Sequence, residues 1–249
     1  MYEAVRIGSF QVRARDAEIA GWVRRSLTEM LNIPMIGYRQ MAYLPLPESV
    51  PENAAFVKIY QRNVEKKFFR RLFAKRNEAL TEGKAYQRFA GCGLLTPKLL
   101  FYGVEGQGTG ERGIVAVEKL QGETAQEYLE RTDDFGLLKK LTCLLGVIHK
   151  KGFSHGDVNF YNFLLCQGEI FIIDLARVKR LNGKRRTRDL ITFFAKTNLL
   201  GVGLDRQREL LSSYEAAAGC NLGEKAEYLL GRAKEKATDF EGTRWVRPD

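Results

Sequence analysis

The chain contains 249 residues, and its 40 Lys and Arg against 30 Asp and Glu give a formal net charge of +10 at pH 7. This length suits one two-lobed domain with a sizeable core, and no apolar run reaches the roughly 18 residues that a transmembrane helix needs. The N-terminus lacks a basic-then-apolar secretory pattern and the cysteines form no C-x-x-C pair. We therefore expect a cytoplasmic protein with reduced, mostly buried thiols and with neither a zinc site nor disulfides.

The first elements of the chain are predicted to be a helix and two strands. Residues 16–31 show the apolar spacing of an amphipathic helix, and residues 35–46 resemble strand sequence broken by prolines. Residues 54–60 alternate like a strand and hold Lys58 between two apolar residues. Lys58 is either a functional side chain or part of a solvated strand face.

A helix is predicted over residues 75–90, and it offers two acidic partners for Lys58. Glu78 and Glu82 are four residues apart and therefore lie on one face of this helix. Glu82 is favoured because an apolar stripe surrounds it, formed by Ala79, Tyr86, Phe89 and Ala90. Glu78 stays the alternative.

The remaining pattern is that of two lobes joined by a hinge. Strands are predicted at 99–102 and 114–117, with a flexible glycine-rich turn between them. The later helical patterns cover residues 124–131, 135–150, 189–197, 205–218 and 222–239. The chain is therefore predicted to be one bilobal α+β domain over residues 1–249, with a small strand-rich N-lobe to about 117, a hinge at about 118–122 and a larger, mainly helical C-lobe from about 123.

The strongest chemical signal is the segment from His155 to Asn162. It combines H-x-D, an Asn five positions after Asp157, and a second Asp, Asp174, at the end of an apolar run. This spacing is typical of phosphoryl transfer from a magnesium nucleotide, in which one Asp deprotonates an acceptor hydroxyl while the Asn and the second Asp hold metal against the phosphates. The apolar runs at 163–165 and 170–173 predict two short buried strands. The alternative is a polar hairpin turn with no chemistry.

Two basic clusters account for much of the net charge. Residues 58–76 hold eight Lys or Arg against Glu65, and residues 177–188 hold seven with no acid. Such clusters suit an anionic membrane surface, a phosphorylated glycolipid or nucleic acid, or they are solvated faces of a basic protein. Within the first cluster, residues 64–75 form a basic amphipathic helix that either lies in a membrane interface or packs on its own lobe.

These features resemble the protein-kinase-like superfamily and, within it, the bacterial lipopolysaccharide-core sugar kinases, which phosphorylate heptose or Kdo. The similarity spans about residues 57–214. It rests on Val57-Lys58, the helix with Glu82 leading to Gly93-Leu94-Leu95-Thr96-Pro97, Leu145-Gly146-Val147-Ile148-His149, the segment from His155 to Leu165, Ile173-Asp174-Leu175-Ala176-Arg177 and Arg188-Asp189-Leu190.

The resemblance implies a role for each matching residue. Lys58 would contact the phosphates of ATP and be held by Glu82, while Asp157 would be the base on the sugar hydroxyl. Asn162 and Asp174 would bind Mg²⁺, which prefers oxygen ligands. The hinge, with Glu118 and Leu120, would meet the adenine through its backbone. Lesser roles fall to His155, which would brace the backbone near Asp174, to Asn159 near the transferred phosphoryl group, and to Arg185, Arg186 and Arg188 at the acceptor.

The chain also departs from the protein-kinase pattern. No G-x-G-x-x-G precedes the Lys58 strand, so the loop over the phosphates is short or differently built. Asp174 is followed by Leu-Ala in place of Phe-Gly, Gly156 stands where many protein kinases have Arg, and no A-P-E follows. Switching by phosphorylation of an activation loop is therefore not implied.

The favoured interpretation is an ATP-dependent and Mg²⁺-dependent kinase of a heptose or Kdo. Its partners would be ATP and an anionic lipopolysaccharide-core acceptor, with peripheral contact at the cytoplasmic face of the inner membrane and no nucleic acid. Rival interpretations are an aminoglycoside- or choline-type phosphotransferase, whose cationic substrates call for acidic linings, a protein kinase, and a membrane-associated pseudokinase that only binds. The sequence names neither the sugar nor the oligomeric state.

Overall fold

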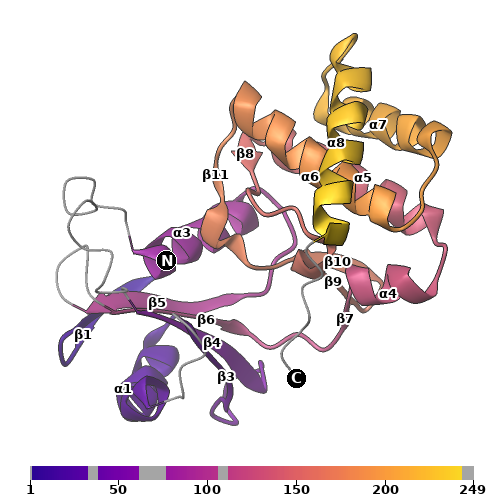
Figure 1. Ribbon diagram of the computed structural model, residues 1–249. Coiled ribbons are helices and arrows are strands. Elements are labelled where there is room, and N and C mark those ends of the chain that lie inside the picture. Colours follow the sequence, from indigo (N-terminus) through magenta and orange to yellow (C-terminus); the bar gives the residue numbers. More distant parts are fainter. Residues whose placement is uncertain (1, 33–38, 62–76, 106–111, 243–249) are drawn as a thin grey trace. The chain divides into compact units, whose positions relative to one another are not determined.

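The computed structural model describes residues 2–32, 39–61, 77–105 and 112–242 (Figure 1). The chain divides into two compact units. The first comprises residues 1–121 together with 174–176, and the second comprises residues 122–173 and 177–249. The predicted basic helix at 64–75 lies outside the described residues, as does most of the predicted 103–113 turn.

The first unit is built on one antiparallel sheet of six strands. Its spatial order is β1-β2-β5-β6-β4-β3. The strands are β1 (Glu3–Ile7), β2 (Phe10–Ala14), β3 (Arg39–Pro45), β4 (Ala54–Gln61), β5 (Leu99–Glu105) and β6 (Arg112–Glu118). The strand that holds Lys58, β4, is paired on both sides, and this pairing fixes the lysine on a rigid base.

Two helices cover opposite faces of this sheet, α1 (Ala17–Leu31) and α3 (Glu78–Gly91) (Figure 1). Side chains alternate along β4, so Val57 and Ile59 join the apolar core that α1 completes, whereas Lys58 lies on the other face. The α1 helix begins at the N-cap Asp16, whose carboxylate accepts from Ile19 N at 2.8 Å.

The α3 helix approaches the sheet closely because it carries a glycine at the contact. A Cβ on Gly83 would lie 2.3 Å from the ring of Tyr102 in β5. A larger residue there would push the helix away from the sheet. The neighbouring residue in α3 is Glu82, so this contact sets the depth at which its carboxylate is held.

The second unit is mainly helical. Its helices are α4 (Ala125–Arg131), α5 (Phe135–Lys150), α6 (Gly183–Leu199), α7 (Leu204–Ala218) and α8 (Lys225–Gly242), with α5 packed on α7 and α6 on α8. Short strands pair β7 (Glu123–Thr124) with β9 (Phe163–Cys166), β9 with β10 (Glu169–Ile172), and β8 (Phe153–Ser154) with β11 (Lys179–Arg180). The 3₁₀ turn η2 (Phe160–Asn162) precedes β9, and another, η3 (Leu175–Arg177), begins in the residues 174–176 that belong to the first unit.

The β9–β10 hairpin closes through a two-residue turn of Gln167 and Gly168. Both residues have positive φ, 52° and 81°, which matches a turn whose twist suits paired strands. The hairpin sits directly after the predicted catalytic segment, and its strands occupy the two apolar runs predicted to form them. Phe160 anchors the start of the hairpin, because its ring lies 5.1 Å from that of Phe193 in α6.

The predicted α+β organisation, strand-rich first and mainly helical second, is confirmed. Three local predictions were incomplete. The β1–β2 hairpin was not predicted. The α6 helix begins at Gly183 and not at 189, because Asn182 caps it by accepting from Arg185 N at 2.9 Å. The α8 helix begins at Lys225 and not at 222.

The four cysteines are free thiols, but only Cys166 is buried, so they are less buried than expected. No helix among the described residues is long and apolar enough to cross a membrane.

Candidate active site

In the first unit, Lys58 is held between two carboxylates. Its Nζ lies 2.9 Å from Oε1 of Glu82 and 3.1 Å from Oδ1 of Asp174. Glu82 is fully buried in α3, whereas Glu78, the alternative partner, is exposed. The structure therefore pairs Lys58 with Glu82.

The second oxygen of Glu82 is also used, because Tyr60 in β4 donates its hydroxyl proton to Oε2. Both oxygens of this buried carboxylate are thus satisfied, as a buried charge requires. Burial alone would lower the pKa of Lys58, but the charges of Glu82 and Asp174 outweigh it and raise that pKa above its usual value. Lys58 is therefore a fixed positive charge, suited to a phosphate ligand.

Asp174 has a backbone conformation that few non-glycine residues adopt. Its φ is 53°, in the left-handed region that Asp tolerates better than most residues. The neighbouring Leu175 is fully buried, and the backbone of Asp174 hydrogen-bonds Tyr86 of α3. Burial, together with the charges of Glu82 and Asp174, raises the pKa of Tyr86 well above its usual value. The Asp174 carboxylate, 28% exposed, is therefore held in place by its backbone and stays accessible.

In the second unit, the segment from Asp157 to Asn162 is folded on itself by hydrogen bonds. The Asn162 side chain donates from Nδ2 to the carbonyl of Asp157 at 2.9 Å, and Asn159 N donates to the same carbonyl at 2.9 Å. Ile173 N donates to the Asn162 carbonyl at 2.9 Å, which ties the segment to the end of β10. These three hydrogen bonds hold the segment that carries Asp157 and Asn162.

Gly156 allows a close approach that no other residue would permit. Its φ is +82°, and a Cβ there would lie 2.5 Å from the carbonyl oxygen of Arg177. The Arg found at this position in many protein kinases would not fit here without backbone movement. The close approach brings Arg177 beside Asp157, and their side chains form an ion pair with a nitrogen–oxygen distance of 3.3 Å.

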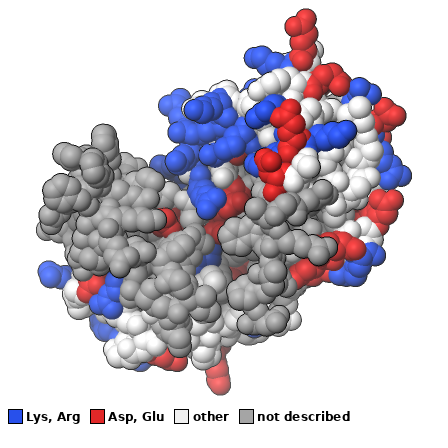
Figure 2. All heavy atoms as spheres, in the orientation of Figure 1, with Lys and Arg blue, Asp and Glu red and all other residues white. Residues whose placement is uncertain are grey.

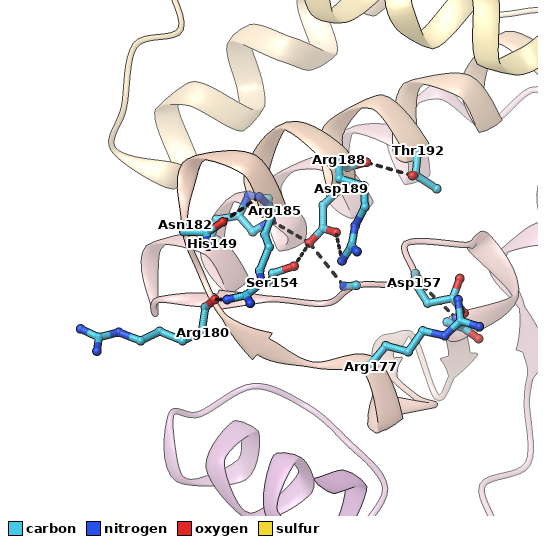
Figure 3. Close-up of polar contacts among 12 residues, drawn as sticks. His149, Ser154, Asp157, Arg177, Arg180, Asn182, Arg185, Arg188, Asp189 and Thr192 are labelled. Carbon is cyan, nitrogen blue, oxygen red and sulfur yellow. Dashed lines mark hydrogen bonds and ion pairs between the residues drawn. The ribbon is translucent and has the colours of Figure 1, made fainter. Parts of the chain in front are cut away.

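A buried carboxylate, Asp189 of α6, contacts the loop that leads to Asp157 (Figure 3). Its Oδ2 accepts from Ser154 Oγ at 2.7 Å, from His149 Nε2 at 3.3 Å and from Gly156 N at 3.4 Å. His149 Nδ1 hydrogen-bonds the Tyr214 hydroxyl of α7 at 2.7 Å, so both ring nitrogens of His149 have a partner. Burial alone would raise the pKa of Asp189, but these hydrogen bonds hold it below its usual value.

The other predicted site residues take varied positions. His155 is fully buried, with its ring 5.8 Å from that of Phe163. Glu118 and Leu120 are half-buried, and the N–H of Glu118 already donates to the Lys98 carbonyl at 2.9 Å. Asn159 accepts from Tyr161 N at 3.4 Å.

The three arginines predicted at the acceptor differ in environment. Arg185 donates to the Arg180 carbonyl at 2.7 Å, and Arg186 is half-buried. Only Arg188 is exposed, and it lies 3.8 Å from Oδ1 of Asp189. Basic side chains gather over β11 and the start of α6 (Figure 2).

Two of the predicted site residues carry oxygen donors of the kind Mg²⁺ prefers, Asn162 in the second unit and Asp174 in the first. Mg²⁺ takes oxygen ligands and usually needs only one or two from the protein, because water and substrate phosphates supply the rest. Among the described residues no cluster of three or more His, Cys, Asp or Glu could form an all-protein metal cage.

Comparison with known proteins identifies the family. The profile of the lipopolysaccharide kinase (Kdo/WaaP) family matches residues 40–214, most of the chain. This chain belongs to that family. No curated protein sequence matches it.

Solved structures show the same fold as this member of the Kdo/WaaP family. One is WaaP in complex with acyl carrier protein, at 18% identity and a TM-score of 0.69, with 92% of this chain and 98% of that chain covered. Another is the Rio2 kinase of Chaetomium thermophilum with ADP, Mg²⁺ and phosphoaspartate, at 14% identity and a TM-score of 0.50, with 96% and 82% covered. At these identities the likeness shows a shared protein-kinase-like fold.

Several side chains that shape this site of the Kdo/WaaP kinase have no role predicted from the sequence. Asp189 and His149 were noted only as matching residues, and Tyr60, Ser154 and Tyr214 were not singled out. One signal was available for Asp189, because it shares the buried face of α6 with Phe193 and Thr197 at helical spacing. A carboxylate on a buried helix face must have partners.

The Glu82→Gln variant should lower kcat/KM for ATP about tenfold or more, because Lys58 loses a charged hydrogen bond that positions it. Glu78→Gln is the matched control, since it changes an exposed Glu of the same helix. Steady-state kinetics with varied ATP measures both variants. Equal kinetics for Glu82→Gln and wild type would show that the ion pair does not position Lys58.

Proposed function

We propose that this Kdo/WaaP kinase is an ATP-dependent sugar kinase that phosphorylates a heptose or Kdo hydroxyl of the lipopolysaccharide core. The observation that carries the proposal is the family match, which spans Lys58, Glu82, Asp157, Asn162 and Asp174. Local contacts support it as well, because Lys58 is paired with two carboxylates and Asp157 is half-exposed in a hydrogen-bonded segment.

In the proposed reaction Asp157 acts as the base. Its carboxylate accepts the proton of the sugar hydroxyl as that oxygen bonds to the γ-phosphorus of ATP. The bond from the γ-phosphorus to the oxygen that bridges it to the β-phosphate breaks, and ADP leaves with the electron pair. The products are the sugar phosphate and ADP, and the proton passes from Asp157 to solvent.

The nucleotide would be held mainly by charge. Lys58, fixed by Glu82, would contact the phosphates of ATP, and the hinge at about 118–122 would meet the adenine through its backbone. Asn162 and Asp174 would hold Mg²⁺, which when bound neutralises charge on the phosphates. His155, fully buried beside Phe163, would brace the loop and take no part in the proton transfer.

The acceptor would be anionic and attached to lipid. The exposed basic side chains around β11 and the start of α6 support this proposal, since they would attract phosphates or an anionic bilayer surface. We infer peripheral contact with the cytoplasmic face of the inner membrane, where such an acceptor is built. An acceptor of the aminoglycoside type is disfavoured because its positive charges would meet this basic surface.

The decisive experiment is mass spectrometry of lipopolysaccharide purified from cells with and without the gene. Loss of one phosphate from a defined core sugar, restored by the wild-type gene and not by Asp157→Asn, would support the proposal. An unchanged lipopolysaccharide would contradict it. Purified enzyme with ATP, Mg²⁺ and the unphosphorylated core then identifies the hydroxyl that is modified.

A further inference from the structure

One face of α6 carries a line of polar and basic side chains. Arg188, Thr192 and Lys196 are spaced four residues apart, so they follow one another along the same face of the helix. A second lysine reaches this face from α8, because Nζ of Lys236 donates to Oγ1 of Thr192 at 2.7 Å. Figure 3 shows Arg188 and Thr192 in succession on α6.

Two of these cations lie in the electrostatic environment of Asp157, and Arg188 lies in that of Lys236. The charge of Asp157 acts on Lys196 and on Lys236, and Arg177 contacts the Asp157 carboxylate directly at 3.3 Å. Arg177 is 62% exposed, so its guanidinium can also turn to a ligand. We name Arg177, Arg188, Lys196 and Lys236 the Asp157 cation cluster.

The two lysines of the cluster are held where a positive charge is disfavoured. Burial lowers the pKa of Lys196, and the attraction of Asp157 and Glu130 does not restore it. Burial likewise lowers the pKa of Lys236, and repulsion from Arg188 and Lys196 lowers it further, against the attraction of Asp157 and Asp189. The opposite holds for Lys58, whose carboxylates raise its pKa. An added anion would relieve the repulsion within the cluster.

We propose that the Asp157 cation cluster binds an anionic group, a phosphate ester or a carboxylate, that the acceptor carries near the hydroxyl to be phosphorylated. This inference rests on the proposed function and specifies the acceptor. An anionic acceptor would be repelled by Asp157, so cations placed around this base offset the repulsion while leaving the carboxylate to take the proton. The cluster would thus select sugars that are already charged.

Acceptor preference tests the inference. The Lys196→Gln and Lys236→Gln variants are compared with wild type on core lipopolysaccharide from cells that lack the gene and on the same material after removal of phosphate esters with hydrofluoric acid. A third acceptor has its carboxylates reduced. The ratio of kcat/KM for the intact over the stripped acceptor should fall about ten- to a hundredfold in each variant, the effect of a lost charged hydrogen bond.

Two results would overturn the inference. One is an unchanged acceptor ratio in both lysine variants. The other is a raised KM for ATP with no change in acceptor ratio, which would mean that the lysines bind nucleotide phosphate. If removal of phosphate esters lowers kcat/KM of the wild-type enzyme, the bound anion is a phosphate ester. If reduction of carboxylates lowers it, the bound anion is a carboxylate. Lys234→Gln, an exposed lysine of α8, is the matched control and should keep the wild-type ratio.

A second measurement separates this inference from the proposed function. If the wild-type enzyme transfers phosphate to none of these acceptors, the proposed function fails, and anion binding is tested directly. Wild-type protein is acylated with an amine reagent with and without inorganic phosphate, and each lysine is quantified by mass spectrometry. Several-fold protection of Lys196 and Lys236, with none at Lys234, supports the cluster as an anion site, and equal acylation overturns it.

Discussion

Asp157→Asn should lower the rate of phosphoryl transfer to the sugar by about 10²- to 10⁴-fold, the usual contribution of a general base. The amide keeps the shape of the carboxylate but cannot accept the proton of the hydroxyl. Nucleotide affinity should stay close to that of wild type, because the proposed nucleotide contacts belong to Lys58, Asn162 and Asp174. Single-turnover transfer and equilibrium binding of a fluorescent ATP analogue measure the two quantities separately.

The control for this variant is Asp133→Asn, which removes an 82% exposed carboxylate that pairs with Arg206 at 3.4 Å. It should keep wild-type turnover, since exposed ion pairs contribute little. A transfer rate within tenfold of wild type for Asp157→Asn would assign the base to another group. Collapse of nucleotide binding with turnover preserved would mean that Asp157 holds nucleotide.

Local pattern was enough to favour Glu82 over Glu78 as the partner of Lys58. Alternation along β4 places Lys58 on one face of the sheet, and helical spacing around Glu82 distinguishes it from Glu78. Both signals depend on residues within a few positions of each other, so no knowledge of packing was needed. Such periodicity signals locate the ends of helices poorly. The start of α6 is an example, because it depends on a single capping residue, Asn182.

The N-terminal hairpin could have been predicted but was not. Phe10, Val12 and Ala14 are buried and alternate with exposed residues along β2, and Gly8 in the preceding turn has a φ of +57°. This is an ordinary hairpin pattern in five-residue strands. Short strands give little periodicity to measure, so the signal was present and faint.

The polar network and the cation cluster could not be predicted from spacing. His149, Ser154, Asp189 and Tyr214 come from four different elements, and their contacts depend on how α5, α6 and α7 pack. Lys236 likewise meets Thr192 only because α8 lies on α6. A sequence indicates that a buried carboxylate needs partners, but only the packed structure identifies them.

Asp189→Ala should destabilise the protein by about 3 kcal/mol or more. It leaves the hydroxyl of Ser154, the imidazole N–H of His149 and the N–H of Gly156 buried without their acceptor, and each such group costs about 1–3 kcal/mol. Asp189→Asn should cost less, because its amide oxygen can occupy the position of Oδ2, and urea unfolding measures both. The surface variant Asp205→Ala, which changes a 97% exposed side chain, should stay within about 0.5 kcal/mol of wild type.

The pH dependence of stability provides a second test of the role of Asp189. The pKa of Asp189 is lower in the folded protein than its usual value of about 3.9. The charge of Asp189 therefore makes its full contribution to the free energy of unfolding above that pH. This contribution is lost as pH falls through the folded-state pKa. The stability gap between wild type and Asp189→Asn should therefore narrow as the solution is acidified below about pH 4. A gap that is constant with pH would show that shape, and not charge, is what Asp189 supplies.

Activity should separate a positioning role of Asp189 from a purely structural one. Gly156 N donates to Asp189, and Gly156 immediately precedes Asp157, so loss of the acceptor loosens the loop that aims the base. At a temperature where Asp189→Ala is fully folded, kcat should fall at least tenfold, with KM for ATP unchanged and with partial rescue in Asp189→Asn. A wild-type kcat in the folded Ala variant would mean that the loop keeps its geometry without this carboxylate. The hydrogen bond from Asn162 to Asp157 and the close approach of Gly156 to Arg177 would then be sufficient.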